Sequence, residues 1–352
     1  MRNVILCCCV MLLISGYSAA RADKGSDGGR FEFGLIGDMP YDARQEREFA
    51  HLMKDMDAAD LAFVAHVGDF WFDGAAWSEE LGGRPPCSDE AFEDRVRLAR
   101  ASRHPFILVP GDNDWTDCHR AKPRPYDPME RLAKLRQMFF QGDRSLGQRT
   151  LQLTRQSQEP RYAAFRENVR WRQEGVLFVT MQVVGSNDNL GRTPQMDAEH
   201  AARSEASIAW MKQAFDLARS GGSRALMIIA QADPQFENSW PANMQQRYML
   251  GGLGIDSPER RRVTGFDGFL AALEKEVLAY GRPVVYVHGD THVFRIDKPL
   301  VGATSRRIIE NFTRVETFGY PDTHWVRGTV DPGNPAVFSF RPEIVKENLV
   351  AH

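Results

Sequence analysis

The chain has 352 residues, of which 43% are hydrophobic and 26% are charged. This composition is sufficient to bury a core and excludes wholesale disorder. The formal net charge of -3 argues against nucleic acid or an anionic membrane as a partner, because binding to either normally needs a basic face.

The N-terminal segment differs in character from the rest of the chain. It begins with a short cationic stretch, continues as an unbroken apolar run over residues 4–14, and ends at residues 20–22 in a small-x-small cleavage site. The sequence therefore predicts a cleaved signal peptide over residues 1–22 and a secreted or periplasmic location. A membrane anchor is the alternative, but this run is shorter than the ~20 residues that cross a bilayer, so no stable span is expected after cleavage.

Cleavage at this site would leave only Cys87 and Cys118 in the mature chain. An even number of cysteines in an exported protein indicates a disulfide, so we predict a Cys87–Cys118 bond that joins two loops. Two unrelated buried thiols are the alternative.

Strand and helix patterns alternate from residue 31 onward. Phe49, Leu52, Met53 and Met56, for example, recur at the spacing of one helical face. Strands are predicted at 31–37, 61–67, 106–109, 176–184, 224–230 and 283–287, and helices around 49–56, 90–101, 198–219 and 266–273. This alternation is typical of a mainly parallel sheet with helices packed on it.

The pattern changes after residue 292. Segments 307–318, 324–330 and 336–341 read as short strands without a helix long enough for a parallel crossover, so they are predicted to form an antiparallel second sheet packed on the first. Residues 141–160 lack the Pro/Gly/Ser bias of a linker and are interpreted as an excursion loop. The expected fold is an α/β two-sheet sandwich flanked by helices, in one domain over residues 31–341.

Four of the predicted strands end in the same dipeptide, Gly-Asp. The four aspartates are Asp38, Asp69, Asp112 and Asp290. One such aspartate is ordinary turn or cap chemistry. Ligands in α/β sheets collect at the carboxyl ends of the strands, however, and several carboxylates that meet there repel one another unless they hold a cation. The four aspartates therefore predict a metal site.

The order of these blocks resembles the calcineurin-like metallophosphoesterases, and the resemblance covers nearly all of the mature chain. That family reads Asp-x-His, Gly-Asp-x-x-Asp, Gly-Asn-His-Asp/Glu, a lone His and Gly-His-x-His. This chain offers Asp38-Met39-Pro40, Gly68-Asp69 followed by Asp73, Gly111-Asp112-Asn113-Asp114, either Gln231 or Asp233, and Gly289-Asp290-Thr291-His292. The resemblance implies a two-sheet fold and metal-dependent hydrolysis of a phosphorylated small molecule.

The resemblance also implies a ligand set. By family likeness Asp69 bridges two metals, Asp38 and His292 bind the first, and Asp112 and Asp290 bind the second. The chain departs from the pattern where Pro40 replaces a histidine ligand, Asp112 an asparagine and Asp290 a histidine. Since oxygen largely replaces nitrogen, the set favours one or two ions of the Mg²⁺, Mn²⁺ or Ca²⁺ type over iron or zinc.

Asp69 and Asn113 are the implied catalytic residues. Asn113 stands where the family has its general-acid histidine and has no acidic proton to give, a loss that typically costs ~10²- to 10⁴-fold. We therefore expect a preference for good leaving groups, such as anhydrides or aryl esters. The alternative is a weakly active or inactive descendant that keeps the fold as a binding or scaffold protein.

Other polar residues near the strand ends have supporting interpretations. Arg120, Arg192 and Arg295 are candidates to bind phosphate. His66 and His288 are interpreted as buried structural residues, and Asp73 and Asp114 as loop braces.

Overall fold

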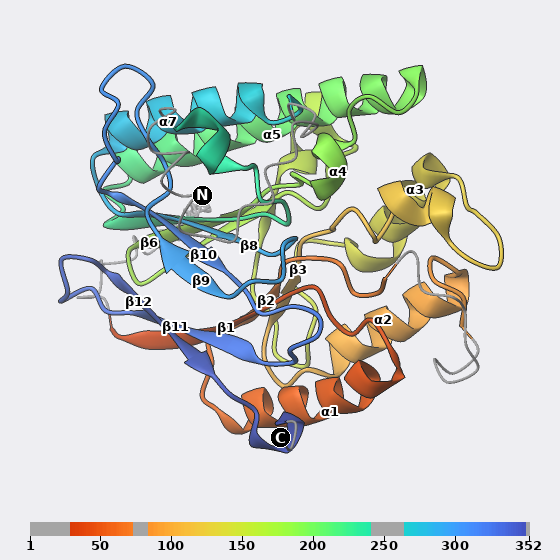
Figure 1. Ribbon diagram of the computed structural model, residues 1–352. Helices are drawn as coiled ribbons and strands as arrows, with labels where there is room; N and C mark the ends of the chain where they lie inside the picture. Colours follow the sequence, from red (N-terminus) through yellow and green to blue (C-terminus); the bar gives the residue numbers. More distant parts are fainter. Residues whose placement is uncertain (1–28, 73–83, 241–263, 350–352) are drawn as a thin grey trace, which may run out of the picture.

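Figure 1 shows the computed structural model, which describes residues 29–72, 84–240 and 264–349. Two sheets are stacked face to face, and helices cover both outer surfaces. The predicted α/β two-sheet sandwich is thus confirmed. The predicted signal segment and Asp73 lie outside the described residues.

The five-stranded sheet has the strand order β12-β11-β1-β2-β3. Its parallel half consists of β1 (Phe31–Ile36), β2 (Val64–His66) and β3 (Phe106–Leu108). Its antiparallel half consists of β11 (Trp325–Val330) and β12 (Phe338–Glu343). The carboxyl ends of the three parallel strands therefore lie at one edge.

The seven-stranded sheet has the order β4-β5-β6-β7-β8-β10-β9. Its strands are β4 (Thr154–Arg155), β5 (Val169–Gln173), β6 (Val176–Thr180), β7 (Ala225–Ile229), β8 (Val284–His288), β9 (Arg295–Asp297) and β10 (Phe312–Glu316). The four central strands, β6, β7, β8 and β10, are parallel. Every residue of β6, β7 and β8 is buried, as expected for parallel strands covered on both faces.

The helices follow their sequence signals. Their bounds are α1 (Ala43–Ala58), α2 (Asp89–Ala101), α3 (Pro128–Phe139), the short α4 (Gly185–Asp188), α5 (Pro194–Ser220) and α7 (Asp267–Tyr280). Side chains of Asp42, Ser88, Asp127 and Thr193 cap the backbone N–H groups at the first turns of α1, α2, α3 and α5. In Figure 1, α5 and α7 cover the seven-stranded sheet, and α1 covers the other.

Three apolar layers hold these elements together. Phe33, Phe63 and Phe178 lie in the layer between the two sheets. Trp210 and Leu273 join α5 and α7 to the seven-stranded sheet in a second layer. The third packs Phe49, Leu52 and Met56 of α1 on β1 and β2, so the helical face predicted from the sequence is the buried one. These layers hold the strand ends of both sheets in fixed positions.

The expected organisation of the C-terminal strands was partly wrong. Residues 324–330 and 336–341 do form antiparallel strands, but they extend the sheet that contains β1. Segment 307–318 instead contributes β10, which pairs parallel with β8 in the other sheet. Residues 289–311, which include β9 as an antiparallel neighbour of β10, make that crossover without a helix.

The excursion segment is also more ordered than expected, since β4 lies within residues 141–160 and pairs with β5. The predicted disulfide between Cys87 and Cys118 is present, with 5.8 Å between the Cα atoms. It links the loop before α2 to the 3-10 turn Thr116–Arg120. In the ranges that the structure describes, no helix combines the length and apolar character needed to cross a membrane.

Candidate metal centre

The four strand-end aspartates lie together at the edge where the two sheets meet. Asp38, Asp69 and Asp112 are at most 6% exposed. The Asp290 backbone N–H donates to Asp38 Oδ1 at 3.0 Å, which joins the ends of β8 and β1 across the two sheets. The backbone N–H of Asn113 lies 3.1 Å from both Asp69 Oδ1 and Asp112 Oδ1, which joins β2 to β3.

The backbone is strained at these positions. Asp38, Asp69, Asp290 and His292 have φ values of 54°, 57°, 76° and 64°. Residues other than glycine rarely adopt this left-handed region, and such strain gathers at functional sites when the surrounding fold holds it in place. These strained positions come at the ends of separate strands, where Asp38, Asp69 and Asp290 follow β1, β2 and β8.

Asp38 and His292 form one side of the centre and fit a cation. Asp38 Oδ2 is fully buried and has no hydrogen-bond partner. His292 Nδ1 lies 3.0 Å from the Tyr320 carbonyl oxygen, an acceptor, so this nitrogen carries the proton and Nε2 presents its lone pair. Nε2 lies 3.6 Å from Asp38 Oδ1. A buried carboxylate oxygen without a donor and an imidazole nitrogen that presents its lone pair together suit a divalent ion.

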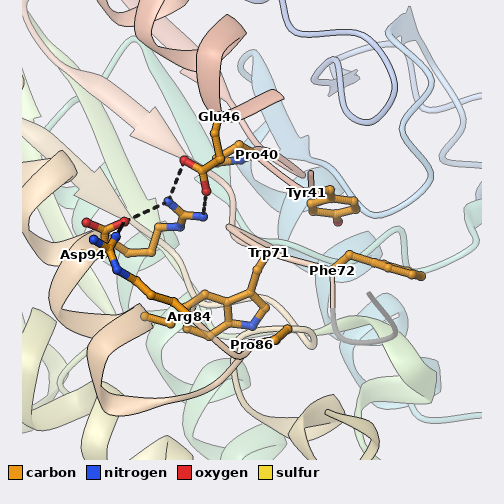
Figure 2. Close-up of a pocket in the computed structure, with 10 residues that line it drawn as sticks. Pro40, Tyr41, Glu46, Trp71, Phe72, Arg84, Pro86 and Asp94 are labelled. Carbon is orange, nitrogen blue, oxygen red and sulfur yellow. Dashed lines mark hydrogen bonds and ion pairs between the residues drawn. The ribbon is translucent and has the colours of Figure 1, made fainter. Parts of the chain in front are cut away.

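Tyr41 is a site residue that the sequence reading missed. Its hydroxyl lies 3.3 Å from His292 Nε2, 3.5 Å from Asp69 Oδ2 and 3.3 Å from Asn113 Nδ2. The ring stacks on Phe72, and Figure 2 shows the two rings side by side. The sequence could have indicated Tyr41 only by its position, since it follows Asp38 by three residues in the same strand-end loop.

Gln231, not Asp233, faces the carboxylates. Its Nε2 lies 3.1 Å from Asp69 Oδ2, 3.2 Å from Asp112 Oδ1 and 3.4 Å from Asp290 Oδ1. Asp233 points its side chain elsewhere and donates its backbone N–H to Asp290 Oδ2 at 3.1 Å. The alternative left open by the sequence is thus resolved in favour of Gln231.

Comparison with known proteins tests the fold. No family model matches the sequence, and no curated protein matches it. Among solved structures, the model is similar to one described as the structure of PhoD, with a TM-score of 0.52 and 12% identity over 88% of this chain and 65% of that chain. The chain shares the fold of PhoD. The present chain therefore covers less than two thirds of the length of the PhoD chain.

Two further solved structures are more distant. GAP50, described as the anchor in the inner membrane complex of Plasmodium, has a TM-score of 0.46 and 10% identity over 92% of this chain and 87% of its own. A 5'-nucleotidase from Candida albicans has a TM-score of 0.39 and 10% identity over 88% of this chain and 50% of its own.

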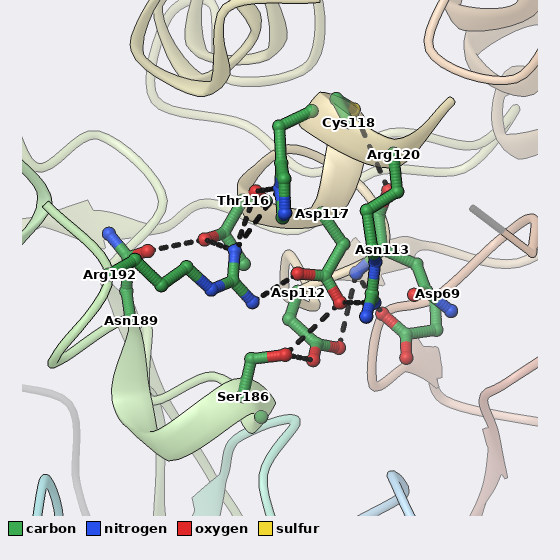
Figure 3. Close-up of polar contacts among 12 residues, drawn as sticks. Asp69, Asp112, Asn113, Thr116, Asp117, Cys118, Arg120, Ser186, Asn189 and Arg192 are labelled. Atoms are coloured by element: carbon green, nitrogen blue, oxygen red, sulfur yellow. Dashed lines mark hydrogen bonds and ion pairs between the residues drawn. The ribbon is translucent and has the colours of Figure 1, made fainter. Parts of the chain in front are cut away.

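Asp112 is connected to two of the candidate phosphate-binding arginines, as Figure 3 shows. The Ser186 hydroxyl lies 2.8 Å from Asp112 Oδ2 and 3.1 Å from Asp117 Oδ2. Asp117 in turn forms ion pairs with Arg192 and Arg120. These arginines therefore lie beside the centre and are held there by a buried carboxylate.

The third candidate arginine belongs to a neighbouring cluster. Ligand atoms of Asp233, His288 and Glu316 lie within 4.8 Å of one another, which makes them a candidate metal site among the described residues. Arg295 already pairs there, with Nη2 at 2.7 Å from Asp233 Oδ2 and Nε at 2.6 Å from Glu316 Oε2. Arg314 Nη1 approaches Asp233 to 3.7 Å. Two guanidinium groups thus balance this cluster, and a cation would be repelled by them.

Asp114 and the two strand histidines support the loops. Asp114 accepts backbone hydrogen bonds from Gly111, Asp69 and Phe70 at 2.7 to 3.0 Å, so it braces two of the Gly-Asp loops as the sequence suggested. His66 is buried and lies between the Met39 carbonyl oxygen and the Gly68 N–H. His288 is also buried, with Nδ1 at 2.7 Å from the Gly289 carbonyl oxygen.

Burial disfavours ionisation of the carboxyl groups in the metal-free site. It raises the pKa of Asp38, Asp69 and Asp290 well above the usual range, and neighbouring carboxylates raise it further. Burial also raises the pKa of Asp114 to about 7, although three backbone donors oppose this change. In contrast, burial lowers the pKa of His66 and His288 to about 4.

These shifts predict how the stability of the metal-free protein depends on pH. Above pH ~7.5 the two histidines are almost entirely neutral in both the folded and the unfolded state, so their titration no longer changes the stability. The carboxyl groups with raised pKa still hold protons in the folded state that the unfolded chain has already lost. The free energy of unfolding should therefore fall as pH rises from ~7.5 to 8.5.

Urea denaturation in EDTA at several pH values measures this slope. The same series with Mn²⁺ is the control, because a cation that binds the ionised carboxylates should stabilise the protein more at pH 8.5 than at pH 7.5. A metal-free stability that stays level or rises over this range would contradict the prediction.

Proposed function

We propose that this protein is a calcineurin-like metallophosphoesterase that hydrolyses phosphate esters or anhydrides of small molecules. The observation that carries the proposal is the convergence of Asp38, Asp69, Asp112, Asp290 and His292 at one strand edge of a PhoD-like fold. A divalent cation bound there would supply charge stabilisation for a phosphoryl group in the transition state.

The residues of the chain have distinct roles in this proposal. Asp38, Asp69 and His292 would hold the cation, and the Tyr320 carbonyl group orients the imidazole. The Asn113 side-chain amide donates to the Tyr41 hydroxyl, which itself lies 3.5 Å from Asp69 Oδ2, and in this proposal the amide redirects to a phosphoryl oxygen. Arg192 and Arg120 add positive charge at the Asp112 side.

A second candidate function is cation binding without catalysis, as in a scaffold protein. It is favoured by one feature of the site: Asn113 stands where the family places its proton donor, and its amide cannot protonate a leaving group. Turnover separates the two functions, because only the enzyme releases phosphate.

The test is a phosphatase assay with Mn²⁺, Mg²⁺ or Ca²⁺ on a matched pair of substrates, an aryl and an alkyl phosphate. Because no general acid assists the leaving group, we expect the aryl ester to react at least ~10²-fold faster. EDTA should abolish both activities. Equal rates on the two esters would refute the leaving-group preference, and no phosphate release with any metal would favour the scaffold function.

We also propose that the chain acts outside the cytoplasm as one domain over residues 31–341. The disulfide between Cys87 and Cys118 supports export, because such bonds persist in oxidising compartments. Mass measurement of the N-terminus of exported protein, expected at residue 23, tests the cleavage site.

A further inference from the structure

We propose that the side-chain amide of Gln231 takes the place of the second cation, so that the centre binds a single divalent ion held by Asp38, Asp69 and His292. This inference rests on the proposed function only for the location of the site. It concerns the number of cations and not the reaction. A two-cation centre is what the family resemblance implies, and the residues present do not fit its second position.

The first argument is the position of the amide nitrogen. Gln231 Nε2 is the common neighbour of Asp69, Asp112 and Asp290, at 3.1, 3.2 and 3.4 Å from one oxygen of each. These three carboxylates are the ligands expected around a second cation. The distances are those of N–H···O hydrogen bonds and exceed the 2.0 to 2.6 Å of typical metal–oxygen bonds. An amide donor therefore sits where the ion would be.

The second argument is that the amide cannot turn round. Gln231 Oε1 accepts a hydrogen bond from the Gly185 backbone N–H at 2.6 Å. To coordinate a cation, Oε1 would have to exchange places with Nε2, and the amide N–H₂ would then face the Gly185 N–H. Two donors would be left in contact in a buried place, since Gln231 is 0% exposed.

The third argument is that the remaining oxygens at the second position already have donors. Asp112 Oδ2 accepts from the Ser186 hydroxyl, and Asp290 Oδ2 accepts from the Asp233 N–H. At the first position, in contrast, Asp38 Oδ2 is buried without a partner.

The charge balance follows from the number of cations. Four carboxylates with two divalent ions are neutral, whereas the same carboxylates with one ion keep a formal charge of -2. One ion leaves the centre less attractive to a phosphate dianion, so the nearby arginines matter more for substrate binding.

The isosteric change Gln231→Glu tests the proposal directly. The glutamate keeps a side-chain oxygen that accepts from the Gly185 N–H. Its second oxygen replaces the amide nitrogen and faces the carboxylate oxygens of Asp69, Asp112 and Asp290. The matched control is Gln137→Glu, the same change at an exposed position of α3. Bound manganese per chain is measured by elemental analysis after equilibration with Mn²⁺ and removal of free ion. We expect one Mn²⁺ in the wild type and in Gln137→Glu, and two in Gln231→Glu.

Thermal unfolding gives an independent readout. In EDTA, Gln231→Glu should melt below the wild type because it adds a buried carboxylate, and Mn²⁺ should raise its midpoint more than that of the wild type. If this variant does not fold, Gln231→His offers a neutral ligand and should also bind two ions.

The outcomes separate this inference from the proposed function. Two Mn²⁺ ions in the wild type, or one in both Gln231 variants, would overturn the single-cation centre. One Mn²⁺ in the wild type without any phosphatase activity would leave the inference standing and refute the enzyme.

Discussion

Asp69→Asn should lower metal-dependent phosphatase activity at least ~10²-fold, because a divalent cation contributes several kcal/mol to the transition state and each 1.36 kcal/mol is a factor of ten. Asp69 lies between the two halves of the site. Its Oδ1 accepts from the Asn113 N–H, and its Oδ2 faces both Tyr41 and Gln231. An asparagine can still accept the hydrogen bond from the Asn113 N–H, but its N–H₂ group would then face the Gln231 N–H₂ group. The asparagine side chain is also neutral, so it provides no negative charge to bind the cation.

The measurement is kcat/KM on an aryl phosphate at saturating Mn²⁺, together with bound manganese per chain. The matched control is Asp216→Asn, the same change at an exposed position of α5, and it should retain wild-type values for both. Wild-type activity in Asp69→Asn would remove Asp69 from the site and contradict the proposed function. Loss of activity with full manganese content would instead place the cation elsewhere.

The arrangement of the strand ends could be predicted because it depends on local patterns. Apolar runs that end in Gly-Asp mark the carboxyl ends of parallel strands, and such ends gather at one edge of a sheet. That rule holds although the parallel strands are divided between two sheets, which the sequence did not reveal. Asp38 and Asp290 come from different sheets and are still joined by a 3.0 Å hydrogen bond.

The inner surface of the site could not be predicted because it depends on the direction of single side chains. Gln231 and Asp233 follow the same strand, and composition alone does not say which faces the carboxylates. The choice is made by the Gly185 N–H at the start of α4, which lies 46 residues away in sequence and donates to the Gln231 side-chain oxygen. Tyr41 enters the site for a similar reason, through long-range contacts with Asn113 and His292.

The sequence prediction missed α3, α4, β4, β5 and β9, and α3 and β4 illustrate two different reasons. The start of α3 carries a recognisable signal, since Asp127 caps the helix and Pro128 occupies its first turn. β4 has only two residues, and its pairing with β5 is set by long-range contact. The parallel pairing of β10 with β8 also depends on long-range contact. The segment that connects the two strands contains no helix, so the sequence has no pattern that indicates a parallel crossover.

Removal of the disulfide should lower the free energy of unfolding by about 3 to 4 kcal/mol, from the chain entropy of the loop that it closes. The two cysteines are 31 residues apart. Cys87→Ala or Cys118→Ala alone already breaks the link, so the double variant should be about as stable as either single variant. Urea denaturation of the three variants, with reduced wild type as the control, measures this.

The same bond also supports the candidate site. The sulfur atoms of Cys87 and Cys118 each lie 3.7 Å from the Asn113 carbonyl oxygen, which accepts a 2.8 Å hydrogen bond from the Trp71 indole. Since the Asn113 backbone N–H binds Asp69 and Asp112, a loosened Asn113 loop should also weaken the centre. We therefore expect the alanine variants to lose activity together with stability. Additive losses of stability in the two single variants would indicate separate packing effects and contradict the cross-link as their cause.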